Sequence, residues 1–150
     1  MNDSPTIERI GRETLEEHRQ IQFYLDQICR ILETLTQGRS GTEPMRRLAA
    51  QLQGLKEQLA EHYRAEQQGL FLAILDALPE CKVEIERLRG EHAKMIEILE
   101  LARLHALQGE ASEARGLRDD LAGFLELFRI HESQEERLLH RARSALQRRG

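Results

Sequence analysis

Apolar residues recur every three or four positions along most of the 150-residue chain. This spacing is that of one face of an α-helix. Helix-breaking residues interrupt the pattern at Gly38 to Pro44, at Leu78 to Cys81, and at Gln108 to Glu110, where Ser112 follows as a candidate helix cap. Segments of about thirty residues remain between the breaks, so the pattern predicts four helices.

Each predicted helix has one continuous inward face. The first carries Ile7, Ile10, Thr14, His18, Ile21, Leu25, Ile28, Leu32 and Leu35. The second carries Met45, Leu48, Leu52, Leu55, Leu59, His62, Glu66 and Ala73. The third carries Ile85, Leu88, His92, Met95, Leu99, Ala102 and Ala106. The fourth carries Leu117, Leu121, Phe124, Phe128, His131, Glu135, Leu138, Ala142 and Leu146. Alternation of threes and fours is typical of bundle packing, and short connections make successive helices antiparallel neighbours. We therefore predict an all-α fold, an antiparallel up-down-up-down four-helix bundle, as a single domain over residues 1–150.

The composition supports a helical domain and limits the partners and the cellular compartment that we expect. Charged residues make up 32% of the chain and aromatic residues 4%, with Leu, Glu, Arg and Ala dominant, which is typical of helices. The net charge of -4 gives no reason to expect a nucleic-acid partner, and we interpret the basic end, Arg141 to Arg149, as a solvated helix terminus. The longest nearly unbroken apolar stretch, Gly69 to Leu78, is too short to cross a bilayer, and the first residues do not form a signal peptide. We expect a soluble, cytoplasmic protein with no membrane partner.

Two cysteines cannot form a disulfide framework. Cys29 and Cys81 are far apart in the sequence and belong to no CxxC motif. We expect both to be small buried residues in a reducing compartment.

The positions of the histidines are the main indication of what chemistry the protein performs. Four of the six fall on the inward faces, one in each predicted helix, and two of these are followed four residues later by glutamate, as His62–Glu66 and His131–Glu135. Residues i and i+4 share a face of a helix, and antiparallel packing brings all four histidines to a similar level. One such histidine alone would more readily be a core residue bonded to a carbonyl. Four at one level, with two glutamates that would be costly to bury without a partner, indicate two metal ions that share two carboxylates.

The remaining histidines and glutamates fall mainly off these faces. We expect His105 and His140 to be surface residues. The neighbouring glutamates, expected to be solvated or to contact ligands from outside, are Glu17, Glu61, Glu91, Glu132 and Glu136; Glu61 and Glu136 remain alternatives that could reach a metal. Imidazole and carboxylate without thiolate suit iron, manganese or zinc, and six donors exceed the four of a structural zinc site. The Glu-x-x-His motif of ferritin-like di-iron proteins is absent.

The order of these motifs resembles the haemerythrin-like cation-binding domain family over about residues 5–147. The matching elements are one histidine in the first helix, His-x-x-x-Glu in the second, one histidine in the third and His-x-x-x-Glu in the fourth. The resemblance implies a cofactor of two non-haem iron ions joined by an oxo or hydroxo bridge. It implies that His18 and His62 bind one iron, that His92 and His131 bind the other, and that Glu66 and Glu135 bridge both.

This chain departs from the oxygen-carrying haemerythrins in two places. Ile96 stands where they have a second histidine on the third helix, and their fourth-helix carboxylate is an aspartate five residues after its histidine. Here Glu135 lies at the fourth position and Glu136 at the fifth. This chain therefore more closely resembles the family members whose site has four histidines and two glutamates. Those members are associated with iron sensing, nitrosative-stress repair or peroxide handling.

The implied ligand count suggests a function. Two histidines, one oxygen from each glutamate and the bridge make five donors for each iron, and one position stays open. We expect binding of O2 or a related small molecule, peroxide or NO, in sensing, storage or detoxification. The alternatives are a di-iron enzyme acting on peroxide or NO, and a metal-free helical interaction module; a protein partner is left open. No catalytic acid or base is evident, and Tyr24 and Tyr63 are possible hydrogen-bond donors. The inward residues expected to keep the site dry are Leu25, Leu55, Met95 and Phe128.

Overall fold

The computed structural model describes residues 4–36, 42–108 and 114–149, and within these ranges every residue except Leu78 and Gln108 is helical. The long helices are α1 (Ser4–Thr36), α2 (Thr42–Ala65), α4 (Lys82–Leu107) and α5 (Ala114–Arg149). Three short elements join α2 to α4: a π-helical segment η1 (Glu66–Leu70), helix α3 (Phe71–Ala77) and a 3-10 turn η2 (Pro79–Cys81). The prediction of an all-α helical bundle is confirmed.

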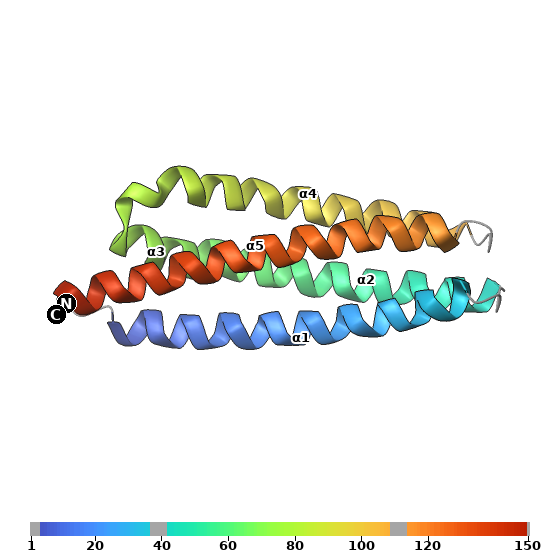
Figure 1. Ribbon diagram of the computed structural model, residues 1–150, viewed down its shortest axis with the longest axis horizontal. Helices are drawn as coiled ribbons and strands as arrows, with labels where there is room; N and C mark the ends of the chain where they lie inside the picture. Colours follow the sequence, from blue (N-terminus) through green and yellow to red (C-terminus); the bar gives the residue numbers. More distant parts are fainter. Residues whose placement is uncertain (1–3, 37–41, 109–113, 150) are drawn as a thin grey trace.

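The helices lie side by side in an elongated bundle (Figure 1), and consecutive long helices run in opposite directions in that view. The beginning of α1 and the end of α5 lie at the same end of the bundle, where Arg143 forms an ion pair with Glu8. Lys56 of α2 and Glu100 of α4 form a second cross-helix pair, with 2.7 Å between Nζ and Oε2. Of the described helices, none is both long and apolar enough to span a membrane.

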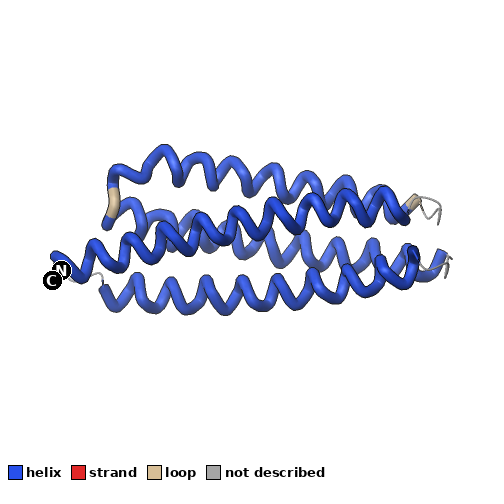
Figure 2. The backbone as a smooth tube through the Cα atoms, viewed as in Figure 1, coloured by secondary structure: helices blue, strands red, loops and turns tan. Residues whose placement is uncertain are grey.

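The predicted breaks can be compared with the structure where their residues are described, and α4 ends at Leu107, just before the third break at Gln108. The break at Leu78 and Pro79 is confirmed and appears as a short tan segment between α3 and α4 (Figure 2). The first predicted loop extends too far, because α2 already begins at Thr42 and includes Pro44. Proline is tolerated in a first helical turn, where its missing N–H has no partner to lose. The rest of that loop, Gly109, Glu110 and the proposed Ser112 cap lie outside the described residues.

The second predicted helix is not continuous. At η1 the backbone N–H of Phe71 bonds the carbonyl of Glu66, a five-residue step in place of four. The additional residue in this turn rotates everything that follows. Ala73, predicted to face the core, is therefore only half-buried, and Ile74 is fully buried instead.

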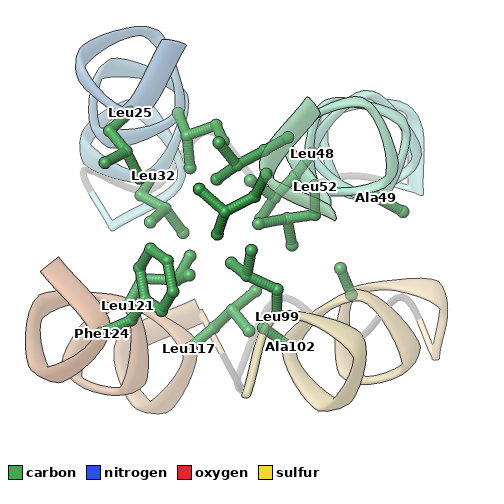
Figure 3. Packing of buried hydrophobic residues seen from close by; sticks show 14 of the residues in the cluster. Leu25, Leu32, Leu48, Ala49, Leu52, Leu99, Ala102, Leu117, Leu121 and Phe124 are labelled. Atoms are coloured by element: carbon green, nitrogen blue, oxygen red, sulfur yellow. The ribbon is translucent and has the colours of Figure 1, made fainter. Parts of the chain in front are cut away.

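Two apolar clusters form the core, one on each side of a polar layer. The larger cluster lies towards the α1–α2 and α4–α5 connections, and Figure 3 shows its side chains meeting from all four long helices, among them Leu32, Leu52, Leu99 and Phe124. The smaller cluster, from Ile7, α3, the start of α4 and the end of α5, closes the other end. Between them the four helices contribute histidines and glutamates, so the site lies in the middle of the bundle and is shielded from solvent at both ends.

Three further residues, predicted to be buried or to face inward, differ in the structure. Cys29 is exposed, because it follows the buried Ile28 and one residue of an α-helix turns the side chain by about 100°. Ile10 and Leu146 are half-buried at the end of the bundle, where Ala145 takes the inward position predicted for Leu146. Cys81 is buried as predicted.

Candidate metal centre

All six predicted site residues meet in the polar layer between the two clusters. None has more than 5% of its surface exposed. The residues are His18 from α1, His62 from α2, Glu66 at the start of η1, His92 from α4, and His131 and Glu135 from α5. Residues on four separate helices reach one level because each lies on the same inward stripe as the leucines that pack the bundle.

The two carboxylates lie between two pairs of histidines. Oε2 of Glu66 is 3.1 Å from Nε2 of His62 and 3.5 Å from Nε2 of His18, whereas Oε1 of the same carboxylate is 3.3 Å from Nε2 of His92. Glu135 is arranged in the same way: Oε1 lies 3.3 Å from Nε2 of His18 and Oε2 lies 2.9 Å from Nε2 of His131. Each carboxylate therefore directs one oxygen towards each histidine pair.

These contacts define two groups of donors with two members in common. One group contains His18 and His62 and the other contains His92 and His131, and Glu66 and Glu135 belong to both. The ligand atoms within each group lie within 4.8 Å of one another. Two cations held in these groups would share both carboxylates.

The chemistry of the donors fits metal ions better than it fits a hydrogen-bonded core. Both oxygens of Glu66, Oε1 of Glu135, and Nε2 of His18 and His62 are buried without a hydrogen-bond partner among the described residues. Such orphaned polar atoms are rare in folded proteins because each costs free energy. Nitrogen and oxygen donors with no thiolate suit iron, manganese or zinc.

In His62, His92 and His131 the outward ring nitrogen, Nδ1, is hydrogen-bonded to a side chain of another helical element. Nδ1–H of His62 donates to Glu17 and Nδ1–H of His131 donates to Glu91, each at 2.8 Å. A donated Nδ1–H leaves the lone pair on Nε2 free for a metal and orients the ring. We expected Glu17 and Glu91 either to be solvated or to contact the site from outside, and the structure shows the second.

His92 has an amide partner where His62 and His131 have carboxylates. Nε2 of Gln67 lies 3.1 Å from Nδ1 of His92, and Nε2 of His92 lies 3.1 Å from Nε2 of His131. Gln67 therefore lies on the outward side of His92, and the inward Nε2 faces His131 and the central carboxylates. If Nε2 of His92 held a cation, the ring proton would be on Nδ1, and the side-chain amide oxygen of Gln67 could accept it there. No spacing in the sequence indicated a role for Gln67, because its orientation depends on η1.

Aromatic rings close one side of the site. The ring of Tyr63 stacks on His92, with centroids 3.8 Å apart, and Phe71 stacks on the same histidine at 5.3 Å. The Tyr63 hydroxyl donates to Sδ of Met95 at 3.4 Å, and burial raises its pKa. Tyr63 is therefore a neutral wall of the site. The four residues predicted to keep the site dry, Leu25, Leu55, Met95 and Phe128, are all buried in the larger apolar cluster.

The pKa values of the two central glutamates are shifted in opposite directions. Burial alone would raise the pKa of Glu66, but contacts with His18, His62 and His92 hold it well below its usual range. Burial and the neighbouring charge of Glu66 raise the pKa of Glu135 well above its usual range. The opposite shifts have one physical cause, because two ionised carboxylates so close together would repel each other. A cation between them would favour the ionised form of both.

The other candidates lie outside the two donor groups. His140 is exposed as predicted, and the half-buried His105 lines a groove between α4 and α5. Glu61 is exposed and pairs with Arg64. Tyr24 lies away from the histidines, with its hydroxyl against Gly54. Glu136 reaches His18 from the outer side, at Nδ1, so the central carboxylate of α5 is the one four residues after its histidine.

A helical bundle with buried His and Glu donors from every long helix is the architecture of a cation-binding domain. The family model described as Hemerythrin HHE cation binding domain matches residues 10–142, nearly the whole chain. This protein therefore belongs to the haemerythrin family of cation-binding domains. No curated protein and no solved structure matches the chain.

Proposed function

We propose that this protein holds two non-haem iron ions and binds O2, or a related small molecule such as peroxide or NO, for sensing, storage or detoxification. The arrangement of Glu66 and Glu135 supports the proposal most strongly. Each sends one oxygen to each histidine pair, which is the arrangement needed to bridge two ions. His18 and His62 would hold one ion, and His92 and His131 the other.

When bound, an iron pair would supply redox-active centres with positions open to a small ligand. The protein's own residues orient the imidazoles, exclude water and neutralise charge. Glu17 and Glu91 fix two histidine rings from outside. The apolar clusters on either side leave no direct contact between the central carboxylates and bulk solvent, since Glu66 is 2% exposed and Glu135 is 1% exposed. Electrostatic interactions are strong in such surroundings.

Metal analysis after anaerobic reconstitution with ferrous iron tests the proposal. We expect two irons per chain and, after oxidation, near-ultraviolet absorption in the region where bridged ferric pairs absorb. His140→Ala serves as the control, because this exposed histidine should not affect iron content. A protein that takes up no iron would refute the proposal. A preparation that loads two irons and converts peroxide to O2 with turnover would assign an enzyme in place of a binding protein.

A further inference from the structure

One of the four histidines differs from the others on its outer side. His62, His92 and His131 each have Nδ1 hydrogen-bonded to a single partner. Nδ1 of His18 is buried and has no hydrogen-bond partner among the described residues, although it lies 3.0 Å from Oε2 of Glu132 and 3.5 Å from Oε2 of Glu136. In the inner centre, Nε2 of His18 and Nε2 of His62 likewise lie close to Glu66 without a hydrogen bond.

These three atoms form a third donor group, separate from the two inner ones. Nδ1 of His18 and one oxygen from each of Glu132 and Glu136 lie within 4.8 Å of one another. His18 is 5% exposed and Glu132 9%, whereas the Glu136 side chain is 46% exposed. The group therefore extends from the buried layer to the surface.

A crevice of about 360 Å³ opens onto this group. It is lined by residues of α1 and α5: Leu15, His18, Arg19, Gln22, Glu132 and Glu136. The guanidinium of Arg19 is paired with Glu16 at 2.6 Å, so its charge is already matched. The crevice thus offers a hydrated cation the Glu136 carboxylate at the surface, and the Glu132 carboxylate and an imidazole nitrogen further in.

We propose that Glu132, Glu136 and Nδ1 of His18 form an outer site for divalent cations, through which ferrous iron is loaded into the centre. This inference rests on the proposed di-iron function. Oxygen and imidazole donors suit Fe²⁺ and similar ions, and two carboxylates offset the charge of one such ion.

His18 is the residue that connects the outer site to the inner one. It belongs both to the outer group and to the inner group with His62, Glu66 and Glu135. Because Nδ1 of His18 has no hydrogen-bond partner among the described residues, turning its ring breaks no hydrogen bond there. A half-turn of the ring would carry a nitrogen-bound ion from the crevice towards the inner carboxylates. Replacement of the ion's water ligands by Glu66 and Glu135 would complete the transfer without any change of oxidation state.

The rate of cobalt uptake by the metal-free protein tests the outer site. Co²⁺ is a spectroscopic stand-in for Fe²⁺, and its uptake can be followed by visible absorption after rapid mixing. We compare Glu136→Gln with Glu97→Gln, which removes the same charge from an exposed position on α4. A carboxylate-lined cleft speeds capture of a cation by about tenfold or more. Glu136→Gln should therefore load roughly tenfold more slowly than Glu97→Gln, and both should end at two ions per chain.

Each outcome has a distinct meaning. Equal loading rates in the two variants would overturn the outer site while leaving the proposed function intact. An end point of one ion in Glu136→Gln would also overturn it, because Glu136 would then be a ligand of the centre itself. A wild-type protein that takes up neither cobalt nor iron would refute the di-iron function as well.

Discussion

Replacing Glu135 by glutamine should remove both metal ions while leaving the metal-free protein folded. Glu135 contacts His18 through Oε1 and His131 through Oε2, so it belongs to both donor groups, whereas each inner histidine pair belongs to one. A neutral amide is a poor bridge between two cations. The same change should cost the metal-free fold little, because burial and the charge of Glu66 raise the pKa of Glu135 and so favour its neutral form.

The size of the effect follows from the stabilisation that bound ions provide. Free metal at about 100 times its dissociation constant stabilises the folded state by about 2.7 kcal/mol per site, so two sites contribute about 5 kcal/mol. In a domain of this size 1 kcal/mol shifts the unfolding midpoint by about 2–4 °C. Iron should therefore raise the midpoint of the wild-type protein by about 10–20 °C. His62→Gln, which affects one group, should keep about half of that shift, and Glu135→Gln almost none.

Paired thermal melts, with and without iron, together with metal analysis measure these shifts. The metal-free midpoint of Glu135→Gln should equal or exceed that of the wild type. If Glu135→Gln retains two irons and a full thermal shift, the bridging role is wrong. If Glu136→Gln loses both irons under the same conditions, the central carboxylate is the one five residues after His131.

Four further results are expected. Replacing Gln67 by leucine should weaken ion binding at the His92–His131 pair by about 10–100-fold in a metal titration, since an outer hydrogen bond is lost; unchanged affinity would remove Gln67 from the site. Burial raises the pKa of Glu132 to about 7 from 4.5, so the folded state favours the protonated form of this carboxyl. The stability that this protonated carboxyl contributes is therefore fully present below about pH 4.5 and is lost as pH rises through 7. The free energy of unfolding of the metal-free protein, measured in urea, should decline less between pH 5 and 8 in Glu132→Gln than in the wild type, and identical slopes would contradict this. His105→Ala should keep its full iron content, and a lost iron would show that the helix phase is misread. Leu52→Ala should reduce the free energy of unfolding by about 2–5 kcal/mol with iron content unchanged, because this buried leucine packs away from the centre.

The inner ligand atoms could be identified from the sequence because helical periodicity is regular. Once His62 and Glu66 fall on one inward stripe, and His131 and Glu135 on another, their meeting in the middle of a bundle follows from antiparallel packing. The same regularity made the apolar surround predictable. It failed at Ala73, where η1 adds a residue to one turn and no periodic pattern signals the change.

The outer contacts depended on tertiary structure. Glu17, Glu91 and Glu132 all lie beside the inward stripe in sequence, and nothing in that spacing distinguishes them from solvated glutamates. Each acts on a histidine of a neighbouring helix, so its role depends on the angle and distance between two helices.

The sequence by itself determined the helical class, the inward faces and the six donors at the centre, because those follow from the fixed geometry of one helix. Tertiary structure decided how the donors divide into two groups, in which direction the pKa of each central carboxylate shifts, and that His18 lines a crevice. These properties depend on distances between side chains of different helices, and interhelical packing sets such distances where local periodicity cannot.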